Sequence, residues 1–364
     1  MRVIMTGGGT GGHIYPAIAI AETIKENNPE AEILFVGTQK GLEKDLVPQN
    51  GYPIKFITVS GFNRKNILKN VRVVKDLLKG SREAKQIIKD FNPDVVIGTG
   101  GYVCGPVVRT AHKMGIKTFI HEQNAFPGVT NKMLEKHVKK IFISFADAEK
   151  YFKDKNKLVL SGNPVRKAFF DADKSHSRKQ LGESDDNFVI LCFGGSRGAG
   201  KINHVMLEVL DSLNHISGIS LYFVTGAVYY DSILKEMKEK GIAQSGNIHI
   251  KKYIDNMQDY LSAADLVISR SGALTISEIT VCGKASVLIP SPNVTGNHQF
   301  YNAKAVADKG GAILIEEKDL SADEILKVIS SLKRNADKLE DMEKASKACA
   351  PKDATKIIYK HLGI

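Results

Sequence analysis

Two glycine-rich loops, each directly behind an apolar strand-like run, constrain this chain of 364 residues more than any other feature. The first loop, residues 7–13, follows the run 2–6, and the second, residues 194–200, follows the run 188–193. An apolar β-branched run that ends in glycines and continues with a helical pattern is typical of strand, tight loop and helix. Further strands and helices alternate behind each loop, which predicts βαβ units. We therefore expect an α/β fold of two Rossmann-like, doubly wound parallel-sheet domains that face a cleft.

Short apolar runs mark the remaining expected strands. They lie at 32–36, 54–59, 95–97, 118–121, 141–144, 220–224, 247–250, 266–269, 286–289 and 312–315, and late helices are expected at 322–332 and 353–362. A turn-rich stretch at 162–166, before the polar stretch 171–187, is the natural domain boundary. We expect domains at 1–163 and 164–345, with a C-terminal helix in 346–364 that crosses back to the first domain.

Composition limits the partners and the compartment. Lys and Arg number 51 against 40 Asp and Glu, a net charge of +11 that suits nucleic acid, an acidic membrane surface or a phosphorylated substrate. The chain starts directly with a strand, and no apolar run is long enough to span a membrane, so any membrane contact is expected to be peripheral. Four cysteines match no metal or disulfide spacing and favour buried thiols in a reducing cytoplasm.

Residues 64–89 stand apart in charge, with nine basic residues against Asp76 and Glu83. Hydrophobic residues recur between them at helical spacing. A helix of this kind can lie on an anionic lipid surface, or it can be a core helix with a solvated basic face. Both interpretations stay open at this point.

The first loop ends in His13, which is placed at the start of the following helix. The helix dipole there disfavours the imidazolium and so favours a neutral ring that can act as a base. The loop also reads as G-x-G-x-x-G, but no acidic residue ends the second strand where a dinucleotide ribose would need one. No Lys-Ser/Thr pair follows, so the loop is not a Walker motif. The plainer alternative is a glycine turn with an incidental histidine.

The second loop is suited to hold a diphosphate, because backbone N–H groups at a helix start and the Ser196 hydroxyl can all donate to an anion. Arg197 is a further candidate for that site. A second strand-to-helix junction, residues 269–278, contains Thr275 and Glu278 at the spacing of a capping box. Glu278 can equally hold a ribose diol, and the sequence leaves these two roles open.

Two more loops follow strand ends in the first half, at 98–102 and 121–124. The first is rich in glycine, and the second groups four polar side chains. Ligands of open α/β sheets bind at the carboxyl ends of the strands, so these loops are expected to line one rim together with the first glycine loop.

Taken in order, six stretches resemble the MurG family of bacterial peptidoglycan N-acetylglucosaminyltransferases. They are residues 6–13, 100–102, 121–124, 162–166, 194–199 and 270–278. The resemblance implies a GT-B glycosyltransferase at the cytoplasmic face of the inner membrane. It would transfer N-acetylglucosamine from UDP-GlcNAc to the C4 hydroxyl of the muramoyl sugar of lipid I, with inversion, giving lipid II and UDP. The implied partners are UDP-GlcNAc, lipid I, an anionic membrane surface and other cell-wall synthesis proteins, with no nucleic acid.

The same resemblance assigns site residues by matching motif. Donor contacts are expected from Thr10, Gly11, Gly12, Asn124, Arg166, Ser196, Ile254, Ala273, Leu274, Thr275, Glu278 and Gln299. Acceptor contacts are expected from Gly8, Gly9, Gly100, Gly101, Tyr102, His121 and Glu122. His298 departs from the family pattern of two adjacent glutamines, which leaves open which side chain there holds the sugar hydroxyls.

In the mechanism this predicts, His13 takes the proton of the acceptor hydroxyl while donors of the second domain stabilise the departing UDP. We expect no cofactor and no essential metal, because N–H groups with Arg166 or Arg197 can offset the diphosphate charge and the chain has no D-x-D motif. Three alternatives remain: an NAD(P)-dependent oxidoreductase, a UDP-sugar 2-epimerase, and a non-enzymatic basic module for membranes or nucleic acid.

Overall fold

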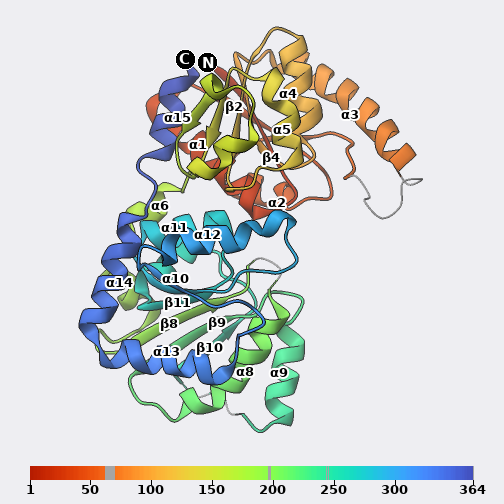
Figure 1. The fold of residues 1–364 in the computed structure, drawn as a ribbon. Helices are drawn as coiled ribbons and strands as arrows, with labels where there is room; N and C mark the ends of the chain where they lie inside the picture. Colours follow the sequence, from red (N-terminus) through yellow and green to blue (C-terminus); the bar gives the residue numbers. More distant parts are fainter. Residues whose placement is uncertain (62–69, 196–197, 243, 245, 364) are drawn as a thin grey trace. The chain divides into compact units, whose positions relative to one another are not determined.

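The computed structural model describes residues 1–61, 70–195, 198–242, 244 and 246–363 (Figure 1). Contacts divide the chain into two compact units. Unit 1 joins Met1–Arg166 with Pro351–Ile364, and unit 2 is Lys167–Ala350.

Unit 1 is built on a parallel sheet with the strand order β3-β2-β1-β4-β5-β6-β7. The strands are β1 (Arg2–Gly7), β2 (Glu32–Gly37), β3 (Ile54–Phe56), β4 (Val95–Gly100), β5 (Lys117–Glu122), β6 (Lys140–Ile143) and β7 (Leu158–Leu160). The chain leaves β1 in one direction to reach β2 and returns on the other side to form β4. This change of direction makes the carboxyl ends of β1 and β4 the switch point where such sheets bind ligands.

Helices cover both faces of this sheet (Figure 1). They are α1 (Gly11–Asn27), α2 (Glu43–Gln49), α3 (Asn70–Phe91), α4 (Cys104–Lys113), α5 (Val129–Leu134) and α15 (Ala354–Leu362), with 3₁₀ turns at Glu135–His137, Ala146–Tyr151 and Lys155–Lys157. Alternate residues of β1 lie on opposite faces of the sheet. Ile4 packs in the core under α3 and α4, whereas Val3 and Met5 pack in the core under α1. Ile358 and Leu362 of α15 are buried in that second core, and each contributes about 1.5–3 kcal/mol of apolar burial.

Unit 2 repeats the plan with the order β10-β9-β8-β11-β12-β13, and its switch point lies between β8 and β11. The strands are β8 (Phe188–Phe193), β9 (Ile219–Val224), β10 (Ile248–Lys251), β11 (Leu266–Ser269), β12 (Ala285–Leu288) and β13 (Ala312–Leu314). The helices are α6 (Lys167–Phe170), α7 (Lys174–Leu181), α8 (Gly200–Asn214), α9 (Tyr230–Glu239), α10 (Met257–Ala263), α11 (Ala273–Val281), α12 (His298–Ala307), α13 (Ala322–Arg334) and α14 (Ala336–Ala348), with a 3₁₀ turn at Thr295–Asn297. The expected pair of doubly wound parallel sheets is confirmed.

Some sequence expectations need correction. The strand expected at 54–59 ends at Phe56, because the Thr58 N–H donates to the Glu83 carboxylate instead of to a neighbouring strand. Cys104 and Cys192 are buried as expected, whereas Cys282 and Cys349 are partly exposed. Among the described residues, no helix combines the length and apolar character that a membrane crossing requires.

Candidate active site

His13 lies in the first turn of α1, directly behind the glycine loop that leaves β1. Its Nδ1 is 3.0 Å from the carbonyl oxygen of Gly8. A carbonyl oxygen can only accept, so this bond assigns the proton of the neutral ring to Nδ1 and leaves a lone pair on Nε2. The ring is partly exposed, and its Nε2 is therefore equipped to take a proton.

The end of β4 encloses the other side of this ring. Gly100 has φ +112°, and a β-carbon on it would lie 3.0 Å from Nε2 of His13. Gly101 also has positive φ, and its β-carbon would meet the Gly8 carbonyl oxygen at 2.4 Å. The Thr99 hydroxyl donates to the His13 carbonyl oxygen at 2.7 Å. Glycine at 100 and 101 thus lets the two loops approach each other closely enough to fix the imidazole.

A buried thiol ties the same two strand ends together. Cys104 Sγ lies 3.0 Å from the Thr6 carbonyl oxygen and accepts from the Gly100 N–H at 3.1 Å. Burial raises the pKa of this thiol to about 12, so it stays protonated and acts as a donor at neutral pH.

Glu43 completes the surroundings of the first loop and was not among the residues predicted from the sequence. Its side chain is only 1% exposed at the start of α2, and one carboxylate oxygen accepts from the Gly9 N–H at 2.8 Å. The other oxygen accepts from the Thr38 N–H and hydroxyl at 2.9 and 2.7 Å. An acid in the first turn of a short helix after the second strand was the available signal, but its partner lies 34 residues away.

His121 is fully buried at the end of β5. Its Nε2 donates to the Gly162 carbonyl oxygen at 3.0 Å, and its Nδ1 accepts from the Gln123 side-chain amide at 2.9 Å. Burial lowers the pKa of His121 to about 4, so the ring is neutral at physiological pH. These bonds hold the β5 end against the 162 turn, and direct contact of His121 with an acceptor stays a prediction.

Glu122 is also buried and organises the loop that follows β5. Its carboxylate accepts from the backbone and side chain of Asn124, from the Gly128 N–H and from the Asn131 amide, at 2.8–3.2 Å. Because its oxygens are occupied by protein donors, Glu122 fixes the position of the half-buried Asn124. Contact of Glu122 with an acceptor likewise stays a prediction.

The remaining unit 1 candidates lie around the same switch point. Thr10 is the exposed residue before α1, and Gly12 is exposed in its first turn. The Arg166 guanidinium lies over the Tyr15 ring of α1, 4.6 Å from its centroid. Tyr102, 62% exposed, lies in the loop after β4.

In unit 2, the second glycine loop leaves β8 and leads into α8. A β-carbon on Gly198 would lie 2.1 Å from the Thr225 carbonyl oxygen, and one on Gly194 would lie 2.4 Å from the Ala199 nitrogen. The described ends of the loop therefore pack tightly, with Gly198 against the residue that follows β9, and such close backbone packing suits an anion site. Ser196 and Arg197 lie outside the described residues.

The helix that follows β11 does not begin with the capping box considered for Thr275 and Glu278. α11 begins at Ala273 with Gly272 as the preceding extended residue, so Thr275 lies inside the helix and is not its cap. The helix starts earlier because Ala273 and Leu274 are already buried against the core. The capping-box explanation is wrong, and a ligand role for the partly exposed Thr275 and Glu278 stays a prediction.

Ile254 and Gln299 lie on segments that follow β10 and β12. Ile254 is 5% exposed, and the Gln299 carbonyl oxygen accepts from the Ser271 hydroxyl at 2.9 Å. The Gln299 side-chain oxygen accepts from the Ser291 N–H at 2.8 Å, so that end of the amide is engaged within the protein. The donor residues expected from the sequence are thus divided between the two units.

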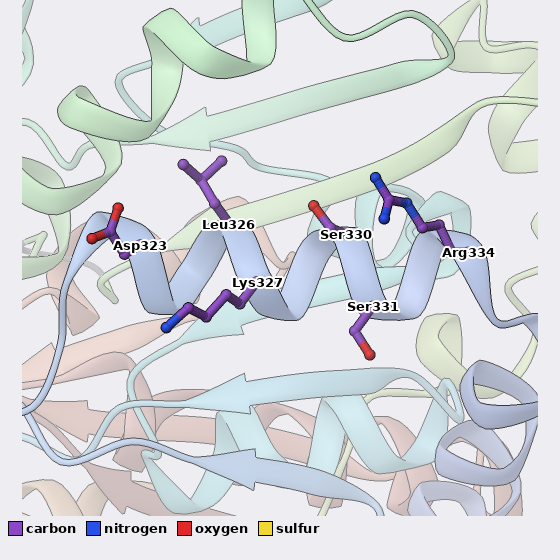
Figure 2. Close-up of a pocket in the computed structure, with 6 residues that line it drawn as sticks. All are labelled: Asp323, Leu326, Lys327, Ser330, Ser331 and Arg334. Atoms are coloured by element: carbon purple, nitrogen blue, oxygen red, sulfur yellow. The ribbon is translucent and has the colours of Figure 1, made fainter.

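A surface hollow on α13 is unrelated to these loops (Figure 2). Its lining residues all come from that one helix and are Asp323, Leu326, Lys327, Ser330, Ser331 and Arg334. None is an expected site residue, and side chains of a single helix do not converge on a ligand as a binding pocket requires.

Two doubly wound units, each with a glycine loop at its switch point, have the architecture of two-domain enzymes that use nucleotide sugars, and the family models place the chain among the glycosyltransferases. Residues 3–143 match the glycosyltransferase family 28 N-terminal domain, and residues 189–358 match the family 28 C-terminal domain. The chain is 48% identical over 359 residues to the UDP-N-acetylglucosamine--N-acetylmuramyl-(pentapeptide) pyrophosphoryl-undecaprenol N-acetylglucosamine transferase of Acetivibrio thermocellus, covering 99% of this chain and 96% of that one. The enzyme of the same name from Alkaliphilus oremlandii is 47% identical over 362 residues, with 100% and 98% covered.

Solved structures of two-domain enzymes have the same fold as this chain. MurG of Acinetobacter baumannii superposes with a TM-score of 0.73 at 26% identity, covering 100% of this chain and 99% of that one. A putative UDP-N-acetylglucosamine 2-epimerase from Listeria monocytogenes gives a TM-score of 0.72 at 14% identity, covering 100% and 95%, which shows a shared fold alone. The chain belongs to glycosyltransferase family 28 and, within it, to the MurG family. Family membership sets aside the oxidoreductase and the non-enzymatic module.

Proposed function

We propose that this enzyme transfers N-acetylglucosamine from UDP-GlcNAc to the C4 hydroxyl of the muramoyl sugar of lipid I, forming lipid II and UDP in peptidoglycan synthesis. Relatives named for this transfer align along 99–100% of the chain at 45–48% identity. The structural observation that carries the proposal is His13, whose Nδ1 bond to Gly8 leaves Nε2 as the proton acceptor.

The chemistry is a single displacement with inversion. The acceptor oxygen O4 forms a bond to the anomeric carbon of N-acetylglucosamine while the bond from that carbon to the diphosphate oxygen breaks. The O4 proton passes to His13 Nε2, and the bonding electron pair leaves with UDP. Inversion requires the base and the leaving group on opposite sides of the anomeric carbon, so we assign the base to unit 1 and the diphosphate to unit 2.

Backbone N–H groups of residues 198–200 and of the α11 start at Ala273 are suited to hold the departing diphosphate. Glu278 lies in α11, where we propose that it accepts from the ribose hydroxyls. Because N–H groups and arginines supply positive electrostatic potential, we propose that transfer needs no metal ion.

We also propose a peripheral attachment to the cytoplasmic side of an anionic membrane, where the lipid acceptor is embedded. On α3, Val74 and Leu78 are 49% and 59% exposed and are surrounded by exposed Lys75, Lys79 and Arg82. Apolar side chains with basic neighbours bind the interface of anionic bilayers.

Arg64, Lys65 and Lys69 of the basic segment lie outside the described residues. Other cell-wall synthesis proteins remain proposed partners.

Radiolabel transfer from UDP-GlcNAc to a soluble lipid I analogue tests the function. We expect labelled disaccharide product only with the acceptor present, at an unchanged rate after chelator treatment. Conversion of UDP-GlcNAc without acceptor would instead identify a 2-epimerase. A rate that chelator abolishes and added divalent metal restores would contradict the metal-free mechanism.

A further inference from the structure

The Gly8–Gly9 peptide group lies between two side chains that the sequence places 30 residues apart. Its carbonyl oxygen, from Gly8, accepts from His13 Nδ1 at 3.0 Å, and its N–H, from Gly9, donates to the Glu43 carboxylate at 2.8 Å. One peptide unit thus connects a carboxylate to the ring that we propose as the base.

We propose that Glu43 is a positioning residue for His13 and acts through this peptide group, an inference that rests on the proposed function. In this role Glu43 contacts neither the sugar nor the diphosphate. It holds the Gly8 carbonyl oxygen where that oxygen selects the Nδ1–H tautomer, and its negative charge polarises the peptide toward the imidazolium that forms during transfer.

The bonding pattern around Glu43 supports a carboxylate in this role. Each oxygen faces a backbone N–H group, from Gly9 on one side and Thr38 on the other, and neither group can accept a proton. The Thr38 hydroxyl accepts from the Gly41 N–H at 3.2 Å, so its own proton is directed to Glu43. Three donors therefore converge on a side chain that is 1% exposed.

Glycines form a close-fitting space for this carboxylate. A β-carbon on Gly8 would lie 2.5 Å from Glu43 Oε1, and one on Gly41 would lie 2.0 Å from Oε2. On the opposite side, Gly101 approaches the Gly8 carbonyl oxygen so closely that its β-carbon would lie 2.4 Å away. The peptide is therefore held between the β4 loop and Glu43, so its orientation depends on both.

The arrangement resembles the carboxylate–histidine pairs that orient a catalytic imidazole, with a peptide group inserted between the two partners. Cys104 on α4 is a buried titratable group close to the same loops, since its thiol bonds to the Thr6 carbonyl oxygen and the Gly100 N–H. Burial raises its pKa to about 12, so it stays neutral through the range in which a histidine base is assayed.

The test compares Glu43→Gln with Glu83→Gln as a matched control. Glu83 also accepts from a backbone N–H and a threonine hydroxyl, both of Thr58, but it does not bond to the glycine loop. We expect Glu43→Gln to lower kcat about 10–100-fold, as for other groups that orient a catalytic ligand or base. The KM for UDP-GlcNAc should change less than kcat does, because the binding of the donor diphosphate is assigned to unit 2 and only Thr10, Gly11 and Gly12 of the expected donor contacts lie on the altered loop.

The pH profile separates positioning from a structural role. Without the carboxylate charge the imidazolium is less stabilised, so the acidic limb of the kcat profile should move to lower pH in Glu43→Gln. Glu43→Asp, which keeps the charge, should recover the wild-type limb and part of the rate. A Glu43→Gln profile with the wild-type limb would overturn the proposal, as would a rate loss explained by a lowered melting temperature.

Nitrogen-15 NMR of the histidine ring gives a readout that does not depend on transfer. In the unmodified enzyme we expect the neutral His13 ring to carry its proton on Nδ1, and in Glu43→Gln we expect a mixture of tautomers. An Nε2–H ring in the unmodified enzyme would overturn the proposal even if the Glu43→Gln protein cannot be prepared. If His13 proves not to be the base, the NMR result still decides whether Glu43 sets its tautomer.

Discussion

The imidazole of His13 lies directly against the α-carbon of Gly100, so that a β-carbon at position 100 would come within 2.8 Å of His13 Cδ2 and 3.0 Å of Nε2. Real β-carbons rarely approach other atoms this closely, and Gly100 also adopts a positive φ that favours glycine. The end of β4 thus fixes the position of the proposed base.

Gly100→Ala should therefore displace the ring. We expect kcat for transfer to fall about 100-fold, the scale of a 1 Å misplacement of a reacting group, while calorimetry shows unchanged UDP affinity. Gly115→Ala is the matched control, because Gly115 also has positive φ (+81°) but has no atom within 4 Å of its β-carbon position. Equal activity losses in both variants would mean that backbone strain, and not the contact with His13, explains the effect.

His121 should make unit 1 less stable as the pH falls. Burial lowers its folded-state pKa to about 4 from an ordinary value of 6.5, so the unfolded chain binds more protons between these values. Above pH 6.5 the ring is neutral in both the folded and the unfolded chain, so its burial does not lower the free energy of unfolding. As the pH falls toward 4, the free energy of unfolding decreases progressively, by about 3 kcal/mol in all. Between pH 7 and pH 5, the melting temperature should decrease less in His121→Gln than in the wild type.

His204→Gln, on the surface of α8, provides the comparison and should retain the wild-type slope. If His121→Gln also retained that slope, the burial of a neutral imidazole at position 121 would not be the cause.

The basic face of α3 should determine membrane binding. Replacing Lys75 and Lys79 by glutamine should weaken binding to phosphatidylglycerol vesicles about 30-fold, at roughly 1 kcal/mol for each charge near an anionic surface. Cosedimentation measures the effect. The double variant Lys235→Gln and Lys238→Gln on α9 removes as many exposed charges and should bind like the wild type. Equal losses in the two double variants would indicate nonspecific charge attraction.

Glu278 should bind the donor nucleotide. Because the carboxylate is proposed to accept from the ribose hydroxyls, Glu278→Gln should weaken UDP binding about 30-fold, within the range for a hydrogen bond to a charged group. Calorimetry with UDP measures this. Glu324→Gln is the control, since Glu324 occupies the corresponding position of a true N-terminal cap at Ser321. Unchanged affinity in Glu278→Gln would remove the ribose assignment.

The sequence predicts the sheets well because their strands are buried on both faces. Runs such as Phe188–Phe193 and Leu266–Ser269 contain almost only apolar residues, and the structure gives them the expected bounds. β7 (Leu158–Leu160) was not predicted, because an edge strand of three residues, none of them buried, has little periodicity. α14 (Ala336–Ala348) was missed because its mostly polar sequence buries few side chains.

The site was harder to predict than the sheets for a physical reason. His13 could be singled out because it directly follows the loop that positions it. Glu43 could not, because its relation to Gly9 exists only once β1 and β2 lie side by side. At 275–278 the local spacing left a helix cap and a ligand role open, and the burial of Ala273 and Leu274, which starts the helix earlier, excludes the cap.

We propose that His13 removes the acceptor proton while unit 2 binds UDP. The most direct test is the transfer rate of His13→Ala with UDP-GlcNAc and a soluble lipid I analogue, measured beside UDP binding. General-base catalysis contributes about 10²–10⁴-fold, so we expect transfer to fall by about 1,000-fold while UDP affinity stays within about twofold. A His13→Ala enzyme that transfers at the wild-type rate would show that His13 is not the base.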